Sequence, residues 1–237
     1  MAGAAAQSGA DSSHGSPYYA RKNSFGLLAA FSPDSSHILL GGAENRMLLN
    51  IGGSYSRRLF LNRIVDWQYD AELLPAALES DPVSTSVNNQ TSPSTATFTN
   101  DDGPILSCAT YTAQYSFVYG GVTYAGTETI SCNGRRWTIG EAMSPIGFQW
   151  NFRPRHKTQP FFVGHGGYMY STEPIPVAAA GSFNFTFDLG VGVEVFRSHT
   201  RSIRGEFRYH HISNHGTASF NPGIDNLMYQ VSYVFGR

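Results

Sequence analysis

The chain has 237 residues, a length that suits a single barrel-sized domain. Its formal net charge is −1, which argues against a nucleic-acid partner because such proteins usually carry a basic surplus. No apolar run is long enough for a membrane-spanning helix, although 14% of the residues are aromatic.

The first predicted segment, residues 1–22, is a flexible N-terminal tail rich in small and polar residues. It lacks the basic start and the apolar core of a signal peptide. If the protein is exported, we therefore expect its signal peptide to have been removed from this chain. Residues 23–237 are predicted to form the folded domain.

Apolar and polar residues alternate from Phe25 almost to the end of the chain, which is typical of β-strands. The pattern predicts eight strands, centred on residues 25–31, 47–55, 65–73, 148–152, 160–171, 183–195, 206–213 and 225–235. Glycines interrupt residues 160–171, so the pattern leaves the facing of that strand open. A soluble sandwich would also show alternation. Short and long links follow the strands in turn, which favours an outer-membrane barrel.

We therefore predict an all-β fold, an eight-stranded antiparallel transmembrane β-barrel. Side chains fill the interior of a barrel of this size. The predicted inward face is rich in charge, and we interpret these residues as structural ion pairs rather than a pore lining. They are Asp66, Asp70, Glu72, Asp188, Glu194, Arg204, Glu206 and Arg208.

The third link, residues 75–145, is predicted to be a long external insertion. Its residues 81–101 are rich in Ser, Thr and Asn, so we expect this segment to be irregular or mobile. Gly120 and Gly121 lie between two strand-like stretches and predict a tight hairpin. Pairing around this turn brings Cys108 close to Cys132, so a disulfide is expected to clasp the insertion.

Reactive side chains lie on the otherwise apolar face of the last two predicted strands. His211 and Ser213 continue one face, and Asp225 heads the apolar row of the returning strand. If Asp225 lies opposite Ser213, it is diagonal to His211 and within reach of it. A nucleophile, a base and an orienting acid can then meet. The alternative is a chance His-x-Ser pair at a strand end.

These residues resemble the PagL-like lipid A deacylases of the bacterial outer membrane. The resemblance is carried by His211-Ile212-Ser213-Asn214, Gly216, Asn221 and Gly223-Ile224-Asp225, so it covers about the last thirty residues. It implies that Ser213 is the nucleophile, His211 the base and Asp225 the orienting acid, in place of the family's Glu. It also implies that Asn214 helps to hold the oxyanion, and Gly216 and Asn221 are further candidates for this role or for substrate positioning.

We therefore expect an outer-membrane esterase that removes an acyl chain, at the 3-position by the resemblance, from lipid A of the outer leaflet. No cofactor is expected, and the scattered histidines predict no metal site. The expected partners are lipopolysaccharide and membrane lipids, and the oligomeric state stays open. Two alternatives remain, a non-catalytic structural or adhesive barrel and a lipid A acyltransferase.

Overall fold

The computed structural model describes residues 18–237. Within these residues ten strands form one antiparallel sheet, and a short 3₁₀ turn, η1, spans Ala178–Ala180. The strands are β1 Asn23–Ser32, β2 Met47–Leu61, β3 Val65–Ser92, β4 Ala96–Pro104, β5 Tyr111–Tyr119, β6 Val122–Phe152, β7 Thr158–Ser171, β8 Phe183–Ser198, β9 Arg201–Ser213 and β10 Ile224–Gly236.

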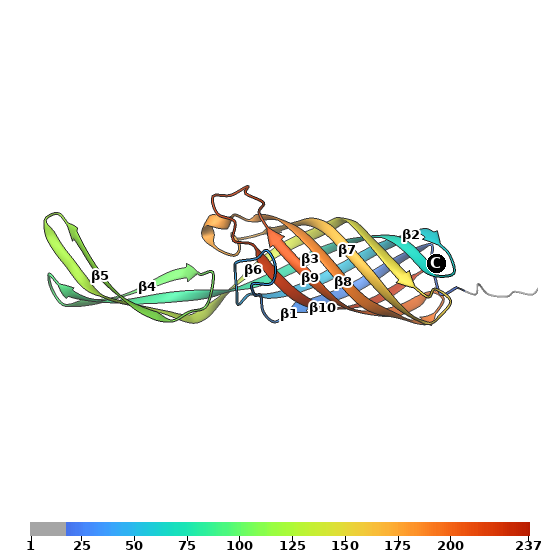
Figure 1. Cartoon of the computed structure of the whole chain (residues 1–237), viewed down its shortest axis with the longest axis horizontal. Helices are drawn as coiled ribbons and strands as arrows, with labels where there is room; N and C mark the ends of the chain where they lie inside the picture. The colour runs from blue at the N-terminus through green and yellow to red at the C-terminus, as the bar shows by residue number, and fades with distance from the viewer. Residues whose placement is uncertain (1–17) are drawn as a thin grey trace, which may run out of the picture.

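The sheet closes on itself and forms a barrel (Figure 1). β1 pairs with both β2 and β10, and β3 pairs with β6, so the closed ring runs β1-β2-β3-β6-β7-β8-β9-β10. The predicted eight-stranded antiparallel barrel is confirmed. β4 and β5 lie outside the ring, at the two edges of the sheet. No helix among residues 18–237 is long and apolar enough to cross a membrane.

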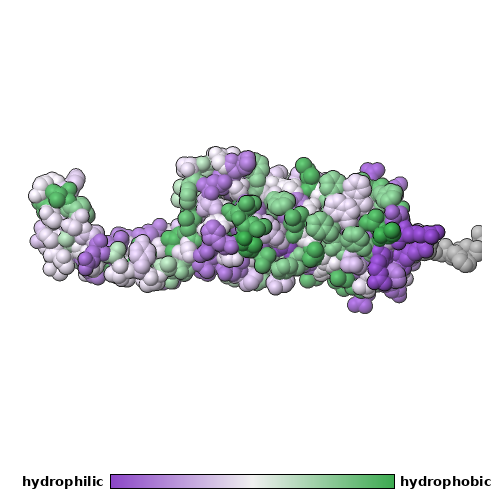
Figure 2. Space-filling model, in the orientation of Figure 1, coloured by the Kyte–Doolittle hydropathy of each residue, from purple (hydrophilic) through white to green (hydrophobic). Residues whose placement is uncertain are grey.

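The two faces of the barrel wall differ in the way that the alternation predicts. In β8 the large apolar residues are exposed on the outside and the polar residues alternate with them on the inside. The facing of β7 is now settled, because Phe161, Val163 and His165 are buried whereas Phe162 and Tyr170 are exposed. Figure 2 shows the hydrophobic surface on the barrel wall and hydrophilic residues at the end that carries the termini.

The barrel interior is filled by a network of buried charges, as predicted. Arg208 donates to both carboxylate oxygens of Glu72 at 2.9 and 3.0 Å and to Glu206 at 2.7 Å. Arg204 donates to Glu194 at 3.1 Å. Because these charges are satisfied by one another, the interior is a packed polar core.

The two ends of the barrel have different connections. The links between β2 and β3, β6 and β7, and β8 and β9 are short, and they lie at the end where Asn23 hydrogen bonds with Arg237. Residues 33–46, 172–182 and 214–223 form longer links at the opposite end. In outer-membrane barrels the short turns face the periplasm, so the long links are external. Most of the predicted N-terminal tail, residues 1–17, lies outside the described residues, and Arg21 in its last part is buried against Glu194 and Ser202.

The insertion between the third and fourth barrel strands is a β-structured arm. The expectation of irregular structure for residues 81–101 is wrong, because residues 81–92 continue β3 and pair with β6, and β4 pairs with the other side of β3. Polar residues form strands here because their backbone groups find partners on both sides, which outweighs their low burial. We call residues 82–134 the arm. It extends from the loop end of the barrel (Figure 1).

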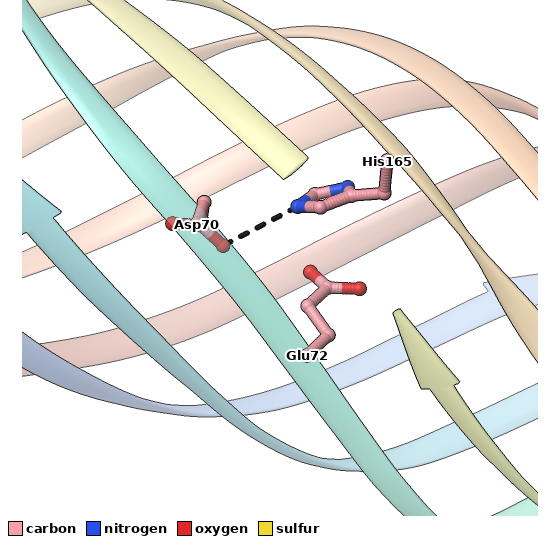
Figure 3. A group of neighbouring side chains, drawn as sticks. All are labelled: Asp70, Glu72 and His165. Carbon is pink, nitrogen blue, oxygen red and sulfur yellow. Dashed lines mark hydrogen bonds and ion pairs between the residues drawn. The ribbon is translucent and has the colours of Figure 1, made fainter. Parts of the chain in front are cut away.

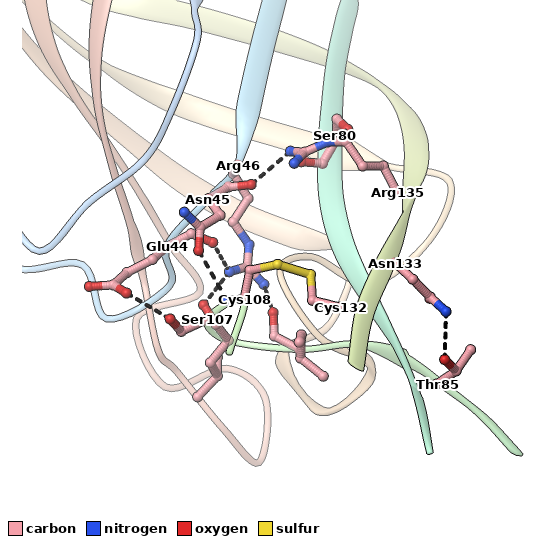
Figure 4. Close-up of a disulfide and its surroundings, with 12 residues drawn as sticks. Glu44, Asn45, Arg46, Ser80, Thr85, Ser107, Cys108, Cys132, Asn133 and Arg135 are labelled. Atoms are coloured by element: carbon pink, nitrogen blue, oxygen red, sulfur yellow. Dashed lines mark hydrogen bonds between the residues drawn. A yellow bond between two sulfur atoms is a disulfide. The ribbon is translucent and has the colours of Figure 1, made fainter. Parts of the chain in front are cut away.

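The base of the arm is held by a disulfide within the arm and by Arg46, which connects it to the barrel (Figure 4). The predicted disulfide between Cys108 and Cys132 is present, with the two Cα atoms 5.5 Å apart. Arg46, in the link between β1 and β2, is fully buried and donates to the carbonyl oxygens of Ile105 and Leu106. These contacts connect the returning segment of the arm to the external loop that precedes β2.

Candidate active site

His211 and Ser213 lie on the outer wall of the barrel, at the loop end of β9. They follow Phe207 and Tyr209 on the outward face, whereas the residues between them point into the interior. In the register with β8, Ser213 lies beside Phe185 and His211 beside Phe187. Together they border an outward-facing groove of about 460 Å³, lined by Leu40, Phe185, Thr186, Phe187, His211, Ser213 and His215.

Asp225 contacts the His211 ring directly. Oδ1 of Asp225 lies 2.6 Å from Nδ1 of His211. The predicted register is wrong by two residues, because Asp225 pairs with His211 itself and not with Ser213. Side chains of directly opposed residues begin about 5 Å apart, so the short carboxylate of Asp reaches the ring without the extra methylene of Glu.

The Asp225 carboxylate is fully buried and is held on both oxygens. Oδ2 accepts hydrogen bonds from the backbone N–H groups of Leu39 and Leu40, at 2.7 and 2.8 Å. Oδ1 accepts a further hydrogen bond from the hydroxyl of Tyr209 at 2.8 Å. This fixed geometry means that Asp225 can hold the His211 ring in one orientation and one tautomer.

The hydroxyl of Ser213 is directed toward the following loop. Oγ donates to Oδ1 of Asn221 at 3.0 Å and accepts a hydrogen bond from the N–H of His215 at 3.1 Å. Within residues 18–237, Ser213 makes no hydrogen bond with the His211 ring. The structure therefore brings His211 and Asp225 into contact, and it places Ser213 in the same groove with its hydroxyl turned to Asn221.

The other predicted site residues shape the loop after Ser213. Asn214 is buried, and its Nδ2 donates to the carbonyl oxygens of Ala180 and Phe220 at 2.6 and 2.7 Å. Its Oδ1 accepts from the N–H of Gly216 at 2.9 Å, and Gly216 has a φ of +78°, which favours glycine. Asn214 therefore uses its amide N–H groups within its own loop and on the link between β7 and β8, whereas Asn221 is exposed beside Ser213.

Sequence reasoning missed the groups that support Asp225. Tyr209 lies on the same face of β9 as His211, two residues earlier, and that spacing is the signal that the sequence offers. Gly41 packs closely against Asp225, because a Cβ there would lie 2.4 Å from the backbone nitrogen of Asp225. Gly223 belongs to the sequence motif, and the structure places it against His211. Its φ is +64°, and a Cβ would lie 3.1 Å from Cε1 of His211.

A possible metal-binding group lies elsewhere, inside the barrel (Figure 3). Ligand atoms of Asp70, Glu72 and His165 lie within 4.8 Å of one another. However, Glu72 is bound by Arg208, and the His165 ring contacts Asp70 at 3.3 Å and Asp188 at 2.9 Å. These contacts already satisfy the donors and acceptors, so the group fits an ion-pair network better than a metal site.

Comparison with known proteins agrees with the family resemblance. A model of the family described as lipid A 3-O-deacylase (PagL) matches residues 102–234, more than half of the chain. Among solved structures, the chain is similar to the outer membrane enzyme PagL, with 14% identity and a TM-score of 0.49, over 90% of this chain and 99% of that one. Comparison with curated protein sequences finds no match.

Two further solved barrels are similar in the same way. Neisserial surface protein A shares 10% identity with a TM-score of 0.42, over 91% of this chain and 97% of that one. The outer membrane protein OprG from Pseudomonas aeruginosa shares 9% identity with a TM-score of 0.42, over 92% of this chain and 97% of that one.

Proposed function

Since the chain belongs to the PagL family of lipid A 3-O-deacylases, ester hydrolases of the outer membrane, we propose that it hydrolyses the 3-O-acyl ester of lipid A, with Ser213 as nucleophile. His211 is the general base and Asp225 orients it. The observation that carries this assignment is the 2.6 Å contact between His211 Nδ1 and Asp225, on the outer wall and in the same groove as Ser213.

The His–Asp contact supports a specific proton path. Because the carboxylate of Asp225 accepts at Nδ1, the proton of the neutral ring lies on Nδ1 and the lone pair lies on Nε2. Rotation of the Ser213 hydroxyl away from Asn221 directs its proton toward this lone pair. Such contacts often tighten only when substrate binds.

The proposed reaction has two steps. Oγ of Ser213 attacks the ester carbonyl while His211 takes its proton, and the tetrahedral intermediate then collapses. The bond between the acyl carbon and the 3-oxygen of the sugar breaks, and His211 returns the proton to this oxygen, which leaves as the 3-hydroxyl. A water molecule, deprotonated by His211, then hydrolyses the acyl-enzyme and releases the fatty acid.

The developing oxyanion needs hydrogen-bond donors close to Ser213. We assign this role to Nδ2 of Asn221 and to the backbone N–H of His215. Asn214 and Gly216, joined by the hydrogen bond from the Gly216 N–H to Asn214 Oδ1, hold their loop in place. Asn221 and the His215 N–H both contact Ser213 Oγ, at 3.0 and 3.1 Å. Loss of one such donor typically lowers kcat about 10²–10³-fold.

The position of the groove suits a substrate that arrives from the membrane. Leu40, Phe185 and Phe187 give it apolar walls on the outer surface of the barrel, near the external loops. An acyl chain of lipid A in the outer leaflet can lie against these side chains without leaving the hydrocarbon. The bilayer then limits the access of water to the ester, which a soluble esterase achieves with a closed pocket.

Mass spectrometry of lipid A tests the proposal. Cells that produce the wild type should yield lipid A that lacks one 3-linked hydroxyacyl chain, and cells that produce Ser213→Ala should not. Ser219→Ala is the matched control, because Ser219 lies in the same loop and its hydroxyl only contacts the carbonyl of Ala179. A gain of one acyl chain would indicate an acyltransferase. Unchanged lipid A with correctly folded wild type would indicate a non-catalytic barrel.

A further inference from the structure

One face of the arm carries aromatic rings on both sides of a row of polar groups. In the register of the arm, Phe98 pairs with Asn88 and Asn88 pairs with Glu128. Two residues further along, Tyr115 pairs with Gly126, and Phe117 follows on the same face. These side chains border a groove of about 480 Å³, lined mainly by Asn88, Phe98, Asn100, Tyr115, Phe117 and Glu128.

The rings of this face are unusually open to solvent. Phe98 is 51% exposed and Phe117 is 54% exposed. Both lie in the arm, which projects away from the barrel (Figures 1 and 2). Phe117 stacks on Tyr124 with ring centroids 5.4 Å apart, which forms a flat apolar platform. An exposed aromatic surface that lies next to polar side chains in the same groove is typical of a ligand-binding site.

The charge of the arm restricts the class of ligand. Residues 82–134 contain no Lys, Arg or His, and their charged residues are Asp101, Asp102 and Glu128. A phosphorylated or otherwise anionic ligand would be repelled and would find no cation to pair with. The groove therefore favours a neutral ligand that has apolar faces and many hydrogen-bonding groups.

A sugar ring has this chemistry. Its C–H groups form an apolar face that packs on an aromatic ring, and its hydroxyls both donate and accept hydrogen bonds. The amides of Asn88 and Asn100 can donate and accept, and the carboxylate of Glu128 can accept. The combination of a ring platform, amides and one carboxylate in an open groove matches an uncharged pyranose better than a peptide or a lipid.

We propose that this face of the arm binds uncharged sugar units of the oligosaccharide that is joined to lipid A in lipopolysaccharide. The source of the sugar rests on the proposed function, since the arm leaves the barrel at the same end as the candidate active site (Figure 1). The saccharide is then held outside the membrane while the acyl ester reaches Ser213. Because such contacts do not change during the reaction, they lower KM and leave kcat unchanged.

Binding by an inactive protein tests the inference separately from catalysis. Full-length Ser213→Ala protein in detergent micelles is titrated, by calorimetry, with the oligosaccharide released from lipopolysaccharide by mild acid, and with lipid A alone. The oligosaccharide should bind, and Tyr115→Ala/Phe117→Ala should weaken this binding about tenfold, the effect of losing two ring contacts. Binding of lipid A should not change.

Val118→Ala is the matched control, because Val118 is 68% exposed on the opposite face of the same strand. It should bind the oligosaccharide as the parent does, and circular dichroism should show equal folding of all variants. Failure of the oligosaccharide to bind, or equal binding by the Tyr115→Ala/Phe117→Ala variant, would overturn the inference. So would a change of oligomeric state in that variant without saccharide binding. The proposed function fails separately if wild-type protein binds the oligosaccharide but leaves lipid A intact.

Discussion

Tyr209 donates a hydrogen bond to Oδ1 of Asp225 at 2.8 Å, and this is the same oxygen that contacts the ring of His211. The two donors approach one carboxylate oxygen from β9, while the N–H groups of Leu39 and Leu40 occupy the other oxygen. Asp225 is therefore held by two elements that are far apart in the sequence, the last barrel hairpin and the first external loop.

Tyr209 is expected to act as a positioning residue. Tyr209→Phe removes one of the hydrogen bonds that hold Asp225, so we expect kcat to fall about three- to tenfold with little change in KM. Deacylation of lipid A in micelles measures both constants. In an Asp225→Asn background the same substitution should have no further effect, because the two residues act through one contact. Tyr233→Phe, on the outer wall of β10, is the control, and an equal loss there would contradict the assignment.

Gly223 is expected to be required for the position of His211. Gly223→Ala places a Cβ 3.1 Å from Cε1 of the ring, at a φ of +64°. Displacement of the ring should lower kcat about 10–100-fold, since catalysis is sensitive to shifts below 1 Å. Gly103→Ala is the matched control, because Gly103 has a φ of +81° and an added Cβ would have no atom within 4 Å. If both variants lose activity equally, backbone strain alone explains the loss.

The charges inside the barrel are expected to stabilise it only as a complete network. Arg208→Met leaves Glu72 and Glu206 without their main cation, so the free energy of unfolding should fall by about 3–5 kcal/mol. Urea denaturation in micelles, followed by tryptophan fluorescence, measures this change. Arg197→Met, at an exposed position near the end of β8, should change the stability by less than about 0.5 kcal/mol. Similar losses for the two variants would argue against the network.

Chelation is expected to leave activity unchanged. The carboxylate of Glu72 is already bound to Arg208, and His165 points into the interior while His211 faces outward. Protein dialysed against EDTA should therefore deacylate lipid A at the same rate as untreated protein. A loss of rate that is restored by one divalent cation would show that a metal ion takes part.

The strands of the barrel could be predicted because the signal is local. Each strand alternates in the sequence with a period of two, and the burial in β8 and β9 follows that period residue by residue. His211 and Ser213 were placed correctly on the outer face for the same reason. The motif that includes Asn214, Gly216, Asn221 and Asp225 was equally readable, since it occupies one short stretch of the chain.

The tertiary structure alone decided how these residues meet. The register of β10 on β9 depends on the whole closed ring. Asp225 was predicted to lie opposite Ser213, and the observed register places it opposite His211. The hydrogen bonds from the backbone N–H groups of Leu39 and Leu40 to Asp225 join residues about 185 positions apart in the sequence. No local sequence pattern can predict such a contact. The arm formed for the same reason, because residues 81–92 become a strand only when β6 and β4 supply partners for their backbone groups.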